Sequence, residues 1–131
     1  MTLRLAPGQV IAIVGLSAKV DRPSYAVARA LRGAGFVVLP VNPIYAGETI
    51  LGELCVSSVL EIERSVDIVN CFRNSDEMPA VAREVVAMTP RAKVLWMQLG
   101  IENPQARIIA EGAGMEVIEN RCIMVAYFSQ H

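Results

Sequence analysis

Short apolar runs alternate with helical patterns along this chain. Buried strands are predicted at the continuous apolar stretches, residues 10–14, 36–39, 66–72, 94–97 and 115–118. Between them, apolar residues recur at helical spacing, which predicts helices over 24–34, 74–88 and 103–113. A short edge strand is predicted around 54–56, and the tail at 123–128 is ambiguous. This alternation of strands and helices is typical of an α/β fold built on a parallel sheet.

Local signals sharpen several of these boundaries. Pro40 and Pro43 are expected to break the second strand. Asn74 is expected to cap the helix after the third strand, with Glu77 completing a capping box. The pair Asn103-Pro104 predicts a helix start, because it places a capping side chain directly before proline at the first helical position.

Composition narrows the class of protein. The 131 residues are 53% hydrophobic and 19% charged, which predicts one globular domain over residues 1–131. A formal net charge of −1 argues against a broad nucleic-acid-binding face. No apolar run reaches the roughly 18 residues that a membrane span needs. Strands buried on both faces explain the apolar character instead.

Few side chains suited to catalysis are present. Cys55, Cys71 and Cys122 lack paired spacing, which favours reduced thiols and a cytoplasmic location over disulfides or zinc. The only histidine is His131, so chemistry that needs an internal histidine is excluded. Cys122 therefore has no histidine partner and is expected to be a buried thiol. No catalytic pair stands out, and we predict neither catalytic residues nor a metal site.

The loop after the first predicted strand carries the clearest candidate chemistry. Gly15 allows a tight turn, and Ser17, Lys19, Arg22 and Ser24 follow it before the next helix. Hydroxyls, cations and the amides at a helix start suit a pyrophosphate group. The same residues also fit an ordinary strand-to-helix connection capped by Ser24. Residue types alone leave both interpretations open, because a single glycine is a weak signal.

The end of the second predicted strand argues against a nicotinamide cofactor. A carboxylate usually bonds the ribose of NAD at this position. Here the segment reads Leu-Pro-Val-Asn-Pro over 39–43, and the next acid is Glu48. An arginine for the phosphate of NADP is also missing. This segment either flanks an adenine or serves as a rigid loop.

Ligands of parallel sheets bind at the carboxyl ends of the strands, where the strand order reverses. We expect the Gly15 loop to meet residues 72–74 and 98–100 there. Arg73 either faces a ligand or pairs with Asp76 or Glu77. Gln98 either reaches a ligand or satisfies the backbone of a loop.

Five segments in order carry a family resemblance. They read VGLS-x4-RPS, PVNP-x-YAG-x4-LGE, VDIVNCFR, VLWMQLGI and NRC, within about residues 8–125. This series resembles the small stand-alone CoA-binding proteins, which are similar to the nucleotide-binding domain of the succinyl-CoA synthetase α subunit. The resemblance implies a Rossmann-like, doubly wound, mostly parallel sheet with helices on both faces, and coenzyme A as the cofactor.

The resemblance also implies which residues bind. Gly15 and Ser17, with Lys19, Arg22 and Ser24, would lie against the CoA phosphates. The adenine and ribose would be flanked by Val41, Asn42 and Pro43. Two further pairs would border the ligand: Phe72 with Arg73, and Gln98 with Gly100. Asn120, Arg121 and Cys122 match the closing motif.

Two positions depart from the family pattern. Ile44 stands where many relatives carry lysine, and Asn120 stands where aspartate is common. The phosphorylated histidine of the larger synthetases has no counterpart, so ligase activity is not inherited with the fold. We therefore expect a module that binds CoA or an acyl-CoA, with a homodimer and an unknown protein partner left open. The alternatives are a regulatory or scaffold domain with a vestigial pocket and a nicotinamide-dependent oxidoreductase.

Overall fold

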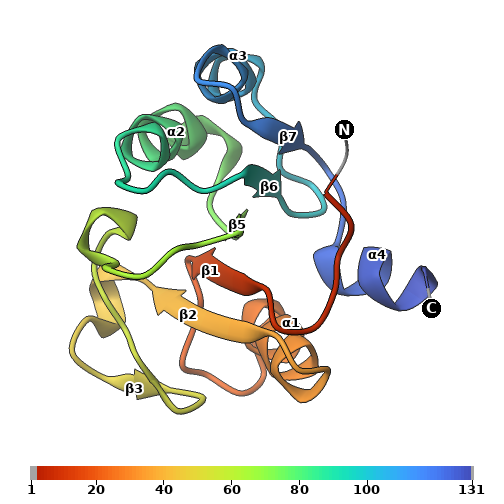
Figure 1. Cartoon of the computed structure of the whole chain (residues 1–131). Coiled ribbons are helices and arrows are strands. Elements are labelled where there is room, and N and C mark those ends of the chain that lie inside the picture. The colour runs from red at the N-terminus through yellow and green to blue at the C-terminus, as the bar shows by residue number, and fades with distance from the viewer. Residues whose placement is uncertain (1–2, 131) are drawn as a thin grey trace.

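A five-stranded parallel sheet organises the chain (Figure 1). The computed structural model describes residues 3–130, so His131 lies outside the described residues. The strands run in the order β2-β1-β5-β6-β7, and every neighbouring pair is parallel. Their bounds are Val10–Val14 for β1, Val37–Val41 for β2, Ile68–Cys71 for β5, Val94–Met97 for β6 and Glu116–Ile118 for β7. The expected doubly wound fold is confirmed.

Helices cover both faces of this sheet. They are α1 at Pro23–Gly33, α2 at Met78–Val86, α3 at Pro104–Gly112 and α4 at Ile123–Ser129. Buried residues of α1 and α4 form one apolar cluster with one face of the sheet, and those of α2 and α3 form a second cluster with the other. Short 3-10 turns at Pro43–Tyr45, Val59–Glu61 and Ser75–Glu77 and a hairpin of β3 (Thr49–Ile50) with β4 (Glu53–Leu54) complete the elements.

The continuous apolar runs follow from this two-sided burial. In β1, Ile11 and Ile13 belong to the cluster with α1 and α4, while Ala12 and Val14 belong to the cluster with α2 and α3. Side chains alternate between the faces of a strand, so a strand covered on both faces needs apolar residues at every position. The amphipathic helices then supply the second half of each core layer.

Four local predictions need correction or completion. Pro40 does not break β2, because β2 is an edge strand, where proline is tolerated. The carbonyl of Pro40 faces away from β1 and accepts the Val56 N–H at 3.2 Å. The stretch at 54–56 forms only the end of the hairpin and a single bridge from Val56 to Val41. The ambiguous tail is helix α4.

The capping box predicted at Asn74 is the fourth correction, and it is wrong. Its side chain makes no capping hydrogen bond, since a 3-10 turn precedes α2 and the Glu77 carboxylate pairs with Arg73 instead.

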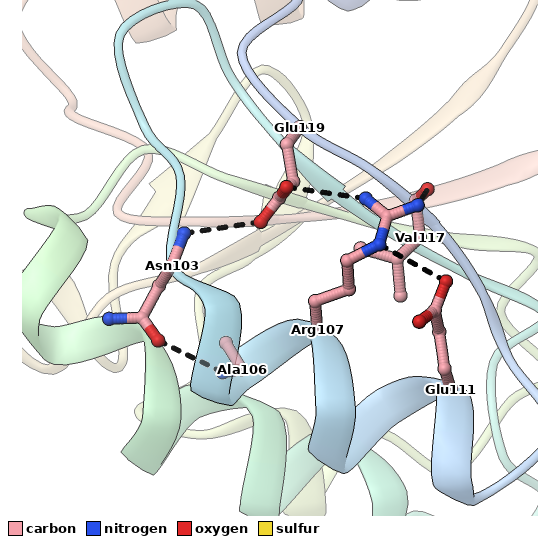
Figure 2. Close-up of polar contacts among 6 residues, drawn as sticks. All are labelled: Asn103, Ala106, Arg107, Glu111, Val117 and Glu119. Atoms are coloured by element: carbon pink, nitrogen blue, oxygen red, sulfur yellow. Dashed lines mark hydrogen bonds and ion pairs between the residues drawn. The ribbon is translucent and has the colours of Figure 1, made fainter.

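The predicted helix start at Asn103 is confirmed. Its side-chain oxygen accepts the Ala106 N–H at 2.9 Å at the start of α3. Figure 2 shows how Arg107 then reaches across to β7, the other edge of the sheet. Its Nη1 lies 3.2 Å from a Glu119 oxygen, and its Nη2 donates to the Val117 carbonyl at 3.4 Å. The Arg107 guanidinium therefore bonds to a carbonyl on the edge strand β7. Without this bond, the carbonyl could accept a hydrogen bond from a strand of another chain.

No helix within residues 3–130 combines the length and the apolar character required to cross a bilayer.

Candidate functional site

The strand order reverses between β1 and β5, and the loops that follow these two strands meet there. The Gly15 N–H donates to the Val41 carbonyl at 2.7 Å, and the Phe72 N–H donates to the Val14 carbonyl at 2.8 Å. Gly15 has φ +88°, and a Cβ added to it would overlap the Phe72 carbonyl oxygen. Only glycine fits this position, because both the backbone angle and the close approach of the Phe72 turn exclude a side chain.

The loop from Gly15 to α1 is held by its own hydroxyls. The Ser17 N–H donates to the Ser24 Oγ at 3.0 Å, and the Lys19 N–H donates to the Ser17 Oγ at 3.0 Å. Ser24 lies in the first turn of α1 and does not cap it, since Arg22 occupies the N-cap position. The side chains of Lys19 and Arg22 remain exposed at the start of the helix. The hydroxyls thus shape the loop, while the side chains of the two cations stay exposed to solvent.

The segment after β2 forms the opposite wall. Asn42 is buried, with its Nδ2 donating to the Leu16 carbonyl at 3.1 Å and its Oδ1 accepting the Ile44 N–H at 3.0 Å. The Tyr45 hydroxyl lies 3.5 Å from the Ser17 Oγ. Asn42 therefore fixes the distance between the two loops by bonding to both.

Between these walls lies a cleft of about 460 Å³, which we call the Gly15 cleft. Its lining consists of Gly15, Ser17, Lys19, Arg22, Pro23, Ser24, Asn42, Ile44, Tyr45 and Phe72. Two cations and no carboxylate are among these described residues. The start of α1 adds the partial positive charge of a helix N-terminus. The cleft therefore favours an anion.

Three of these lining residues are not among the predicted binding residues. Pro23, Ile44 and Tyr45 all lie inside the RPS and PVNP-x-YAG segments, but only Ile44 drew attention in the sequence, as a departure from the family pattern. The available signal was their position in the chain, since Pro23 follows Arg22 directly and Ile44 and Tyr45 follow Asn42 within three residues. An apolar or aromatic residue within a loop gives no indication by itself of whether it lines a cleft.

A second hollow of about 440 Å³ adjoins the Gly15 cleft across Phe72 and is lined by residues 72–75 with Gly100 and Ile101. Arg73 lines it, and its Nε lies 2.9 Å from a Glu77 carboxylate oxygen. The Gly100 N–H donates to the Asn120 Oδ1 at 2.7 Å. Asn120 of the closing motif thus orients the Gly100 turn, and the turns after β5 and β6 lie together as expected.

Three predicted site residues lie away from both hollows. Val41 and Pro43 line a smaller hollow of about 100 Å³ that also includes Arg73. Gln98 is buried, and its Oε1 accepts hydrogen bonds from Asn70 Nδ2 at 3.1 Å and from the Ile123 N–H at 3.2 Å. The Gln98 side-chain oxygen therefore satisfies the backbone at the start of α4, while a contact of Gln98 with the ligand stays a prediction.

Two of the three thiols are buried, which makes them poorly suited to act as nucleophiles. Burial raises the pKa of Cys71 to about 12 and also raises the pKa of Cys55. Cys122 directly precedes α4 and is partly buried. Within the described part of the chain, no three histidine, cysteine or acidic side chains lie close enough together to hold a metal ion.

The chain is similar in sequence and in structure to known proteins. The family model of the CoA binding domain matches residues 9–127. Uncharacterized protein YneT of Bacillus subtilis is 42% identical over 117 residues, which cover 89% of this chain and 84% of that protein. The structure of cell-free ID.343 from Thermus thermophilus matches with a TM-score of 0.90 and 35% identity over 95% of this chain and 91% of that one.

A larger protein contains the same fold. Dinucleotide forming acetyl-coenzyme A synthetase 1 of Ca. Korarchaeum cryptofilum matches with a TM-score of 0.68 over 85% of this chain and 26% of its own. At 20% identity, this likeness concerns the fold alone. The family model, in contrast, spans nearly the whole sequence. The chain therefore belongs to the CoA binding domain family, and its ligand is coenzyme A.

Proposed function

We propose that this chain binds coenzyme A, or an acyl-CoA, with the diphosphate in the Gly15 cleft and without ligase chemistry of its own. The observation that carries the proposal is the charge of the cleft, which has Lys19 and Arg22 and no carboxylate among its lining residues. Arginine and lysine beside a helix start form a suitable site for a diphosphate.

Another groove of similar size does not suit such a ligand. It runs along β2, measures about 410 Å³ and contains Glu53, Glu61 and Glu63 with Arg64 as the one cation in its lining. Three carboxylates would repel a diphosphate. The position of the Gly15 cleft at the reversal of strand order also agrees with the general location of ligands in such sheets.

The remaining parts of the cofactor have natural places beside the diphosphate. The ribose and adenine would lie against Ile44 and Tyr45, after β2. The pantetheine arm would cross Phe72 toward the hollow of Arg73 and Gly100. Asn42, Gln98 and Asn120 would act as positioning residues, because their side chains are bonded to other parts of the protein.

A binding role without transfer chemistry is consistent with the residues near the cleft. Cys71 is fully buried with a raised pKa, and no histidine lies within residues 3–130.

Three free cysteines accord with a cytoplasmic location, which we include in the proposal. Homodimer formation stays a prediction. Analytical ultracentrifugation tests it by measuring the mass of the protein in solution.

Isothermal titration of the full chain with CoA, NAD and NADP tests the proposal. We expect CoA alone to bind, and Arg22→Gln to weaken it by about tenfold by removing a charge-assisted contact. Absence of CoA binding at millimolar ligand would contradict the proposal. Equal binding of NAD would favour the nicotinamide alternative. Native mass spectrometry of the purified protein adds a direct check for retained CoA.

A further inference from the structure

The charges of the Gly15 cleft lie on one wall only. Lys19 and Arg22 belong to the loop before α1, whereas the wall after β2 presents Asn42, Ile44 and Tyr45. Ile44 is 77% exposed, so its side chain is available to a ligand but offers only hydrocarbon. A ligand with two separate anionic groups, one against each wall, would therefore meet cations at only one of these groups.

We infer that this cleft recognises the diphosphate of coenzyme A but not the phosphate on its ribose, so that dephospho-coenzyme A binds about as tightly as coenzyme A. The inference rests on the proposed function, and it assigns Ile44 as the specificity-determining residue. In nucleotide-binding sheets of this kind, the ribose lies at the end of the second strand. That position is the uncharged wall.

The polar groups of this wall are already engaged. Asn42 uses both ends of its amide on the Leu16 carbonyl and the Ile44 N–H. The Tyr45 hydroxyl lies near the Ser17 Oγ. A phosphate recognised by a protein usually receives charge-assisted hydrogen bonds from arginine or lysine. Neither arginine nor lysine is among the described residues that form this wall.

Arg73 is the cation that could substitute, and its surroundings argue against it. It lines the small hollow behind Pro43, but its Nε is paired with Glu77 at 2.9 Å. The same hollow contains the Glu84 carboxylate, which accepts the Ser58 hydroxyl at 2.7 Å. A ribose phosphate placed there would meet a carboxylate as well as the arginine, and like charges repel.

The experiment compares the two ligands on the full chain. Isothermal titration with coenzyme A and with dephospho-coenzyme A, at one fixed salt concentration, gives the ratio of their dissociation constants. We expect the two constants to agree within about fivefold, a small difference for a phosphate. The variant Ile44→Lys should raise the preference for coenzyme A over dephospho-coenzyme A by about tenfold, measured as the ratio of the two dissociation constants.

Ile44→Gln is the matched control, because it is polar and long but uncharged, and its ratio should equal that of the native chain. A preference of the native chain for coenzyme A above about fivefold would overturn the inference, and its loss in Arg73→Gln would identify the cation responsible. An Ile44→Lys chain without a new preference would overturn the assignment of Ile44. If neither ligand binds the native chain, the proposed function fails first.

Discussion

Two polar corners at the carboxyl end of the sheet contain similar residue types but use them differently. At the Gly15 cleft, the hydroxyls and Asn42 hold the loops together while Lys19 and Arg22 line the cleft with exposed side chains. At the other corner, Gln98 is buried and bonds to Asn70 and Ile123. A polar residue after a strand is thus evidence for a ligand only where its hydrogen bonds are not already made within the protein.

This contrast predicts that some variants change the stability of the protein and that others change its affinity for the ligand. Internally bonded groups should change the free energy of unfolding, because removing one leaves a buried partner unsatisfied. The exposed cations should change ligand affinity, because exposed side chains contribute little to stability.

The largest effect is expected at Gly15. Gly15→Ala should lower the free energy of unfolding by about 3 kcal/mol or more, since the new Cβ overlaps the Phe72 carbonyl in addition to the strain of positive φ. Gly47→Ala is the matched control, with φ +92° and nothing within 4 Å of the added Cβ, and should cost only about 1–2 kcal/mol. Urea unfolding measures both. Equal losses would show that the contact with the Phe72 turn is unimportant.

Gln98→Met should follow, with a loss of about 2 kcal/mol or more in the free energy of unfolding. The substitution keeps the volume but leaves the Asn70 Nδ2 and the Ile123 N–H without their acceptor. Coenzyme A affinity should not change at a temperature where the variant is folded. A weakened affinity with unchanged stability would instead place Gln98 at the ligand.

Removing a cation from the Gly15 cleft should weaken ligand binding without changing stability. Lys19→Gln is expected to weaken coenzyme A by about tenfold, equivalent to about 1.4 kcal/mol, with unfolding unchanged. Added salt should weaken binding less in this variant than in the native chain, because one screened attraction is gone. Lys93→Gln removes a charge directly before β6, at the opposite end of the sheet, and its affinity should match the native value.

The smallest effect concerns Cys71, at the end of β5 between the two corners. Burial raises the pKa of its thiol from 9.0 to about 12, so the folded chain keeps a proton that the unfolded chain releases above pH 9. Stability from this thiol is therefore full below pH 9 and falls between pH 9 and 12, by about 1 kcal/mol at pH 10. Urea unfolding of the native chain and Cys71→Ala at pH 8 and 10 isolates the contribution. Parallel pH dependence in the two chains would mean that the thiol is accessible.

The sequence by itself determined most of the fold. Apolar runs such as 10–14 need a sheet covered on both faces, and Asn103-Pro104 needs a helix start, because both requirements act over a few neighbouring residues. The residues that surround the Gly15 cleft were mostly predictable as well, since loops after parallel strands converge on one edge.

Only the tertiary structure decided what each polar side chain bonds to. Pro40 lies within β2 because its strand is at the edge, and Glu77 pairs with Arg73 rather than capping a helix. Gln98 turned inward because the N–H at the start of α4, 25 residues further along the chain, needed an acceptor. Such choices depend on which distant groups are brought within hydrogen-bond distance, and local sequence carries no information about them.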